Sequence, residues 1–312
     1  MTLPTDIDLI THGSPCVNFS VSGKQAGGDK GSGTPSSLMW YTVDIVEHIR
    51  PKIILWENVK NILSPKHRHN FDSYLKAMEN LGYTNFYEVL NAKDYGIPQN
   101  RERVYTISIR NDMLEKRKGI FTFPEPRGLS LRLKDILVDE EYVPEKYYLN
   151  KPFTMSMSIL GSVIGKLEIK GHDCIKRIYS IKGIAPTLTT MMGGNREPKI
   201  AVAAAMRGRY NTEGKTEQKL EISNREIANT ITTVQKDSLV SRDIRVRKLM
   251  PIECWRLMGF DDEDFYKAQG VGISDTQLYR QAGNSICVSV LEAIFKEMKR
   301  TLSDFKFKKD YE

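Results

Sequence analysis

The sequence predicts an α/β fold, an open sheet with helices on both faces, combined with a smaller, mostly β domain. Over the first 110 residues, short apolar segments of strand length alternate with segments of helical periodicity, which favours a sheet covered by helices. Short β-like pieces and turns then extend to about residue 243, and helical patterning returns from Pro251. We therefore expect domain bounds of 1–118, 119–243 and 244–312, with the first and last segments forming the α/β domain.

The first predicted strand, residues 6–10, leads into a turn with the sequence Gly13-Ser14-Pro15-Cys16. Residues 17–37 are rich in glycine and serine, and a loop of that length without structure of its own is usually functional or disordered. Apolar residues at helical spacing predict an amphipathic helix over residues 38–49. The continuous apolar run at residues 52–56 is typical of a buried parallel strand.

A second helix is predicted over residues 71–81, where Gly82 would stop it, and strands are predicted at residues 86–90 and 104–109. In the middle of the chain, residues 183–190 (Gly-Ile-Ala-Pro-Thr-Leu-Thr-Thr) resemble residues 226–233 (Glu-Ile-Ala-Asn-Thr-Ile-Thr-Thr). Two copies are too few for a solenoid, so we expect two similar strand–turn units.

Composition indicates an ordinary folded protein, with 40% hydrophobic and 27% charged residues among 312. No apolar run approaches the ~20 residues that cross a bilayer, and the first ten residues do not resemble a secretory signal. The four cysteines lie far apart, without the paired spacing of zinc sites or disulfide frameworks. His67 and His69 fall at a basic, solvated helix start. We expect a cytoplasmic protein without a membrane partner and without a metal.

The net charge of +7 is unevenly distributed along the chain. Residues 161–250 hold 17 Lys and Arg against 9 Asp and Glu, a net of +8, so the rest of the chain sums to −1. One interpretation is a solvated basic surface, and the other is a face that binds phosphates. Charge alone does not decide between them.

Cys16 lies just beyond the carboxyl end of a predicted strand, which is where open α/β sheets bind ligands. A lone cysteine is more often a small buried hydrophobe. Here, however, Glu57 ends the next strand, and Arg101 and Arg103 precede another, so all are expected on one rim. Together with a glycine-rich loop that can close, they form the set needed for nucleophilic attack on an aromatic base.

Five ordered motifs resemble those of cytosine-5 DNA methyltransferases of the bacterial or phage type. They are residues 13–16 (Gly-Ser-Pro-Cys), 57–59 (Glu-Asn-Val), 98–103 (Pro-Gln-Asn-Arg-Glu-Arg), 247–260 and 281–286 (Gln-Ala-Gly-Asn-Ser-Ile). The resemblance covers essentially the whole chain, and the order and spacing of the motifs make chance an unsatisfactory explanation. It implies a Rossmann-like methyltransferase sheet, with a target-recognition domain at residues 119–243.

The resemblance also implies a chemistry. The Cys16 thiolate would add to cytosine carbon 6, and Glu57 would hold or protonate ring nitrogen 3. Arg103 would bind the exocyclic oxygen, and Arg101 would brace the site. S-adenosyl-L-methionine would supply the methyl group, and the base would be flipped out of double-stranded DNA. The loop at residues 17–37 would close over it and exclude water.

The remaining site residues follow from the same resemblance. The implied cofactor-binding residues are Pro15, Leu38, Asn284, Ser285 and Ile286. The implied DNA-binding residues are Ser20, Ser22, Lys24, Gln99, Thr187, Arg196, Arg207 and Arg209. Thr187-Leu188 resembles the family's Thr-Leu pair, and Thr230-Ile231 in the repeated segment is a weaker candidate. These threonines are equally compatible with ordinary strand positions.

The match departs from the family pattern before residue 6. The glycine-rich cofactor loop (Phe-x-Gly-x-Gly-Gly) and the two acidic residues that normally follow it are absent. We therefore expect an N-terminally truncated sheet that alone binds S-adenosyl-L-methionine poorly and has little activity. A late start codon, a decayed gene, or a second polypeptide that completes a split enzyme would each explain this. Val17 and Pro35 also replace the usual glutamine and arginine.

The expected function is methylation of cytosine carbon 5 in a specific duplex DNA sequence, in restriction–modification or phage self-protection. Two alternatives remain at this stage. One is an inactive or split DNA-binding remnant that keeps the basic segment. The other is a transfer-RNA cytosine methyltransferase, which is less favoured because an insert of more than about 100 residues provides a surface for reading duplex DNA.

Overall fold

The computed structural model describes six stretches of the chain. They are residues 6–20, 25–115, 120–155, 162–210, 216–223 and 243–301. The chain divides into two compact units. The first unit comprises Met1–Tyr95, Glu102–Arg127 and Val290–Glu312, and the second comprises Gly96–Arg101 and Gly128–Ser289. The predicted three-segment domain division stays a prediction, and residues 244–289 fall in the second unit by their contacts.

The first unit contains a four-stranded mixed sheet of order β1-β2-β4-β3. Its strands are β1 (Leu9–His12), β2 (Ile53–Val59), β3 (Tyr83–Asn91) and β4 (Glu102–Arg110). β1 pairs parallel with β2, whereas β4 is antiparallel to both of its neighbours. The carboxyl ends of β1 and β2 and the start of β4 therefore meet at one edge of the sheet.

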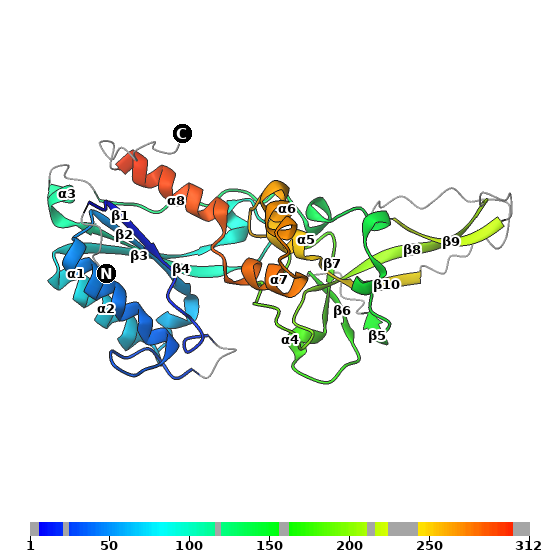
Figure 1. Ribbon diagram of the computed structural model, residues 1–312, viewed down its shortest axis with the longest axis horizontal. Coiled ribbons are helices and arrows are strands. Elements are labelled where there is room, and N and C mark those ends of the chain that lie inside the picture. The colour runs from blue at the N-terminus through cyan, green and yellow to red at the C-terminus, as the bar shows by residue number, and fades with distance from the viewer. Residues whose placement is uncertain are drawn as a thin grey trace. The chain divides into compact units, whose positions relative to one another are not determined.

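Helices cover both faces of this sheet, as predicted (Figure 1). α1 (Met39–Ile49) and α2 (Arg68–Asn80) lie on one face, and α8 (Val288–Thr301) lies on the other. Shorter pieces are η1 (Pro35–Leu38), η2 (Lys60–Leu63), η3 (Ala92–Tyr95) and α3 (Asn111–Glu115). The predicted end of α2 is confirmed, because Gly82 has a φ of 79° and its N–H bonds to the carbonyl of Glu79.

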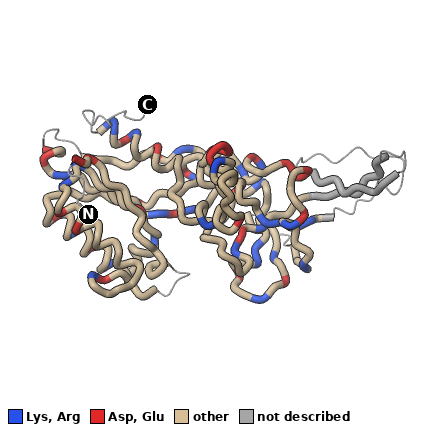
Figure 2. The backbone as a smooth tube through the Cα atoms, in the orientation of Figure 1, with Lys and Arg blue, Asp and Glu red and all other residues tan. Residues whose placement is uncertain are grey.

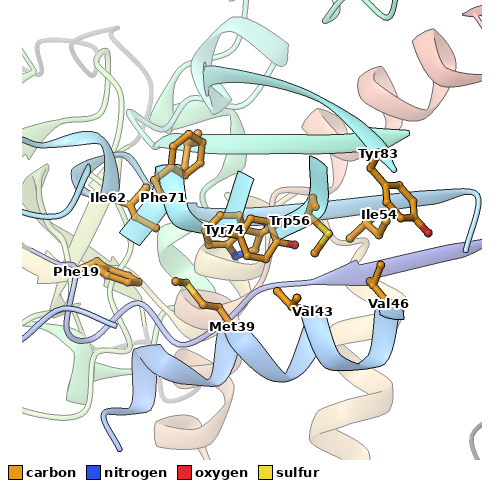
Figure 3. Close-up of a cluster of buried hydrophobic side chains, with 12 residues drawn as sticks. Phe19, Met39, Val43, Val46, Ile54, Trp56, Ile62, Phe71, Tyr74 and Tyr83 are labelled. Carbon is orange, nitrogen blue, oxygen red and sulfur yellow. The ribbon is translucent and has the colours of Figure 1, made fainter. Parts of the chain in front are cut away.

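An aromatic cluster forms the core between this sheet and the two N-terminal helices (Figure 3). The Trp56 ring of β2 lies 4.2 Å from the Tyr74 ring and 5.8 Å from the Phe71 ring, both on α2. His12 at the end of β1 stacks on Trp56 at 5.7 Å. This packing fixes the ends of β1 and β2 from which the site loops emerge.

One expectation about the surface is wrong. His67 was predicted at a solvated helix start, but it is 1% exposed and its ring packs edge-on against Phe19 at 5.4 Å. His69 is exposed, and its Nε2 lies 2.9 Å from an Asp29 carboxylate oxygen. Helical periodicity predicted the helix, but it could not predict that the loop carrying Phe19 packs against the start of this helix and buries His67.

The second unit contains a six-stranded sheet, which falls almost wholly within the segment 119–243 that was predicted to be mostly β, together with several helices. Its strands are β5 (Phe153–Met155), β6 (Val163–Leu167), β7 (Arg177–Ser180), β8 (Lys199–Tyr210), β9 (Thr216–Ser223) and β10 (Asp243–Lys248). Their order is β10-β8-β7-β6-β5, and β9 also pairs with β8. Its helices are η4 (Leu133–Ile136), η5 (Glu140–Tyr142), η6 (Glu145–Tyr147), α4 (Asp173–Lys176), α5 (Pro251–Arg256), α6 (Asp262–Gly270) and α7 (Asp275–Asn284).

A buried ionic network stabilises the second unit. Arg247 of β10 is fully buried and donates from Nε to Glu140 at 2.8 Å. Its two terminal nitrogens each donate to the Glu253 carboxylate at 2.9 Å. Glu253 in turn accepts the backbone N–H of Met250 at 2.6 Å and of Val138 at 3.0 Å. The network thus joins β10, α5 and the segment around Glu140.

Over the six described stretches, no helix is both long and apolar enough to cross a membrane. Within the same residues, no group of three or more His, Cys, Asp or Glu is arranged to hold a metal ion. Lys and Arg are intermixed with Asp and Glu in the described parts of each unit (Figure 2).

Candidate active site

The turn that follows β1 is attached to β2 through Ser14. The Ser14 hydroxyl accepts hydrogen bonds from Trp56 Nε1 at 3.0 Å and from Asn58 Nδ2 at 3.1 Å. Trp56 and Asn58 are each 1% exposed, so both donors are rigidly held in the core. The serine of the Gly-Ser-Pro-Cys motif therefore fixes the position of the turn relative to β2.

Cys16 lies at the start of a short backbone turn. Its carbonyl accepts the N–H groups of Phe19 at 2.9 Å and Ser20 at 2.8 Å. Phe19 is fully buried, and its own carbonyl accepts Asn61 Nδ2 at 2.6 Å. Cys16 itself is partly exposed and forms no disulfide. The cysteine residue is therefore partly open to solvent, while the residues just after it are anchored.

Glu57 and Arg103 form an ion pair at the same edge of the first unit. Arg103 Nε lies 3.0 Å from Glu57 Oε1, and the two side chains are only 13% and 12% exposed. They are diagonal neighbours across β2 and β4, because Val59 is the partner of Arg103 and Tyr105 the partner of Glu57. A Cβ placed on Gly13 would lie 3.7 Å from Glu57 Oε2. The structure thus brings together the Cys16 turn, the carboxylate and the guanidinium.

Gln99, predicted to bind DNA, is instead an internal residue of the second unit. Its side chain is fully buried, and its Oε1 accepts the N–H of Leu188 at 3.1 Å while its Nε2 donates to the Leu257 carbonyl at 2.7 Å. Both ends of the side chain are therefore occupied by protein groups, and the predicted DNA contact of Gln99 stays a prediction. Neighbouring Asn100 accepts the Thr187 hydroxyl at 2.6 Å through its carbonyl.

Arg101 joins the Thr187-Leu188 segment to the turn that ends α7. It is 4% exposed and donates to the carbonyls of Leu188 at 3.1 Å, Gly283 at 3.3 Å and Ser285 at 2.9 Å. Gly283 packs so closely that a Cβ there would lie 2.0 Å from the Thr189 carbonyl oxygen. These contacts are those of a bracing residue, and the predicted part of Arg101 in catalysis stays a prediction.

The predicted cofactor residues are divided between the two units. Pro15 and Leu38 belong to the first unit, and both are exposed, Leu38 by 47%. Asn284, Ser285 and Ile286 belong to the second unit, where Asn284 is exposed and the other two are partly exposed. Their shared role in one site stays a prediction.

The predicted DNA-binding residues have different settings. Ser20 is partly exposed, and Arg196 is exposed on a turn in which Gly193, Gly194 and Asn195 all have positive φ. Arg207 and Arg209 are on β8, but their side chains fall outside the described residues. Ser22, Lys24 and the pair Thr230-Ile231 also lie outside them.

Part of the basic excess of residues 161–250 has internal partners. Lys166 and Arg177 both pair with Asp173, at 2.6 and 2.8 Å. Lys199 is 1% exposed, and its amine donates to the Glu197 carbonyl at 2.8 Å. Burial lowers the pKa of Lys199 to about 8. The charge count of this segment therefore overstates the number of cations that both face solvent and lack an acidic partner.

Sequence reasoning missed two contributors to the site. The apolar run around Trp56 indicated a buried strand but not the hydrogen bond from its indole to Ser14. Ser36, in the glycine- and serine-rich stretch, is fully buried and bonds on both sides of Cys16. No spacing or periodicity in the sequence distinguishes it from the exposed serines nearby.

The fold is that of a methyltransferase. The chain is similar to a solved methyltransferase structure from Entamoeba histolytica, EhMeth, with a TM-score of 0.57, 17% identity, and coverage of 96% of this chain and 78% of that one. It is also similar to the Dnmt2 methyltransferase of S. pombe, with a TM-score of 0.55, 18% identity, and coverage of 95% and 79%. At these identities the likeness defines the fold alone.

Sequence comparison then identifies the family. The model of the C-5 cytosine-specific DNA methylases matches residues 1–300. The orphan methyltransferase M.SPBetaI of Bacillus phage SPbeta is 35% identical, over 94% of this chain and 83% of its own length. The type II methyltransferase M.HhaI of Haemophilus parahaemolyticus is also 35% identical, over 94% and 76%.

The chain therefore belongs to the C-5 cytosine-specific DNA methylase family, and it is a DNA cytosine-5 methyltransferase. The predicted family and enzyme class are confirmed. The comparisons do not favour the two alternatives, a binding remnant and a transfer-RNA enzyme. Family membership also implies a methyl donor.

Proposed function

We propose that this chain transfers a methyl group from S-adenosyl-L-methionine to carbon 5 of a cytosine flipped out of duplex DNA, with Cys16 as the nucleophile. The observation that best supports this is the shielded Glu57–Arg103 pair beside the turn that ends in Cys16. A thiol, an acid and a guanidinium at one sheet edge are the groups that addition to a pyrimidine needs.

Each residue has a separate task in the proposed reaction. The Cys16 thiolate forms a bond to ring carbon 6, which pushes electron density toward carbon 5. Glu57 holds ring nitrogen 3 by a hydrogen bond and delivers a proton as negative charge develops there. Arg103 donates to the exocyclic oxygen while its Nε keeps the Glu57 carboxyl in place. When bound, the cofactor supplies an electrophilic methyl group. A solvent water then takes the proton from carbon 5, the sulfur leaves carbon 6 as a thiolate, and the proton on ring nitrogen 3 returns to Glu57.

Exposed and partly exposed side chains in each unit suit the binding of a methyl donor of this type. Pro15 is exposed just after the carboxyl end of β1, where α/β sheets bind ligands, and Leu38 of η1 is an exposed apolar residue. Asn284 offers an exposed amide, and Ser285 and Ile286 follow it at the end of α7. We propose that these five residues bind the cofactor.

We propose that residues 119–243 read the DNA target and that residues 1–118 and 244–312 form the catalytic part. Thr187 is partly exposed on a segment whose next residue is clamped by Gln99 and Arg101, so its position is well defined. The exposed Arg196 is suited to phosphates or base edges. The further proposed DNA-binding residues are Ser20, Ser22, Lys24, Arg207 and Arg209.

A covalent trapping experiment tests the nucleophile. Duplexes with 5-fluorocytosine in many sequence contexts are incubated with the protein and S-adenosyl-L-methionine. Fluorine cannot leave as the proton does, so the sulfur–carbon bond persists and the complex survives denaturing electrophoresis. We expect Cys16→Ser to abolish the complex and Cys174→Ser, which alters an exposed cysteine, to preserve it. A complex of equal yield with Cys16→Ser would exclude Cys16 as the nucleophile.

We place the biological role in restriction–modification or phage self-protection, because the named relatives include type II and phage methyltransferases. Sequencing of 5-methylcytosine in the DNA of a host that expresses the chain tests this and also reveals the target sequence. Methyl transfer to transfer RNA but not to duplex DNA in parallel assays would contradict the proposed substrate.

A further inference from the structure

A single serine hydroxyl spans the backbone on both sides of the proposed nucleophile. Ser36 Oγ donates to the carbonyl of Pro15 at 2.7 Å. The same oxygen accepts the N–H of Asn18 at 3.1 Å. Pro15 directly precedes Cys16 and Asn18 follows it by two positions, so the two bonds enclose the cysteine. Because the hydroxyl acts as donor and acceptor at once, both bonds are compatible with a single proton position.

Ser36 is itself firmly placed. It is fully buried at the second position of η1, next to Pro35, whose ring restricts the backbone. Gly28 packs against it so closely that a Cβ there would lie 3.0 Å from the Ser36 carbonyl oxygen. The indole of Trp40 donates to the Gly28 carbonyl at 2.8 Å, which holds this second loop in place. The hydroxyl is therefore a fixed point against which the Cys16 turn rests.

Cys16 needs such a fixed point because it is only partly buried and lies on a turn rather than in a strand. From Ser14 the turn is bonded to β2, and from Phe19 it is bonded to Asn61. Between these anchors, the Cys16 carbonyl accepts two backbone N–H groups, and Ser36 adds side-chain bonds to the residues on either side of Cys16. Attack on a ring carbon requires an approach of about 3–3.5 Å with aligned orbitals, and a displacement of about 1 Å can reduce the rate about 100-fold.

We propose that Ser36 is a positioning residue for Cys16: its hydroxyl fixes the backbone from Pro15 to Asn18 and so sets the direction of the thiol. It acts through the cysteine backbone rather than by touching the substrate. This inference rests on the proposed function, because it assumes that the Cys16 thiol is the nucleophile.

Hydrogen exchange at cytosine carbon 5 measures the addition step without the methyl donor. The thiolate bonds to carbon 6, and carbon 5 takes a proton from water. Loss of the original hydrogen from carbon 5 and departure of the sulfur then restore cytosine, so atoms balance. The probe is genomic DNA with tritium at cytosine carbon 5, which presents many sequence contexts. Tritium release into water gives the rate at saturating DNA.

We expect Ser36→Ala to slow tritium release about 10- to 100-fold at saturating DNA. The matched control is Ser37→Ala, because Ser37 lies in the same short helix but donates to the Thr34 carbonyl at 2.7 Å instead. That control should stay within about threefold of the unaltered protein. Circular dichroism at the assay temperature verifies that each variant is folded, and fluorescence anisotropy measures its affinity for the DNA.

A second readout does not depend on activity. The Asn18 N–H loses its acceptor in Ser36→Ala, so deuterium uptake of the peptide around Asn18 should accelerate in that variant alone. Tritium release equal to that of Ser37→Ala, in a folded variant, would overturn the positioning role while leaving Cys16 as the nucleophile. Failure of the unaltered protein to release tritium would remove the nucleophile itself, and with it the role of Ser36.

Discussion

Replacement of Glu57 by glutamine tests the acid of the site with little change in shape. Glu57 and Arg103 are 12% and 13% exposed, and Arg103 Nε lies 3.0 Å from Glu57 Oε1. The amide oxygen of glutamine still accepts from Arg103, but it carries no full charge and has no proton to deliver to a ring nitrogen. The substitution thus separates the chemical contribution of the carboxyl from its packing.

The magnitude follows from that geometry. A hydrogen bond to a charged group contributes about 1.5–3 kcal/mol, and since an acceptor remains we expect a loss of about 1 kcal/mol in the free energy of unfolding. A positioned acid typically contributes 10²–10⁴-fold in rate, or about 3–5 kcal/mol of barrier. The effect on methyl transfer should therefore far exceed the effect on stability.

The assay is methyl transfer from labelled S-adenosyl-L-methionine to DNA, measured beside urea unfolding. Glu102→Gln provides the matched control on β4, since Glu102 forms an exposed ion pair with Lys60 at 2.8 Å. We expect the control to stay within about threefold in rate, because exposed pairs contribute about 0–1 kcal/mol. A Glu57→Gln protein that is folded and transfers methyl groups within threefold of the unaltered rate would refute the assignment.

Three other predictions concern stability. Arg247→Met should lower the free energy of unfolding, measured in urea, by about 3–5 kcal/mol, because it leaves two buried carboxylates without their cation. The control Arg245→Met, whose partner Glu145 is exposed, should lower it by less than about 1 kcal/mol. Equal losses of unfolding free energy in the two variants would contradict this prediction. Gly283→Ala should reduce both the melting temperature and the DNA affinity, because the added Cβ would lie 2.0 Å from the Thr189 carbonyl oxygen. An unchanged melting temperature would show that the segments around Gly283 and Thr189 separate freely. Burial lowers the pKa of His12 to about 3, below the ~6.5 of an unfolded chain, so the unfolded state binds more protons between these values. The free energy of unfolding should therefore fall as the pH decreases below about 6.5, by up to about 1.4 kcal/mol per pH unit. His12→Asn should make that decline less steep when urea unfolding is measured at several pH values.

Much of the fold follows from local sequence pattern. The helices near residues 38–49 and 71–81 and the strands that flank them were predictable, because burying one face imposes a period on the residues of that segment. The same reasoning placed Cys16 and Glu57 at strand ends on one edge of a sheet. The ordered motifs predicted the family, which the comparisons confirm.

Partners distant in sequence were beyond such reasoning. The insertion of β4 between β2 and β3, in the opposite direction, is what places Arg103 diagonally across from Glu57. From the sequence alone, Gln99 cannot be distinguished from a glutamine that binds DNA. Its side chain is buried and accepts the N–H of Leu188, which is 89 positions away in the sequence.

The sequence by itself therefore determined the class of fold and the family, because motifs and periodicities are properties of short segments, and it predicted which groups react. Only the tertiary structure decided which polar side chains face solvent and which hold the backbone. Ser36 and Gln99 bond to backbone groups across loops, and Arg247 neutralises carboxylates on other elements. Such pairings depend on how separate segments pack, and no local pattern specifies them.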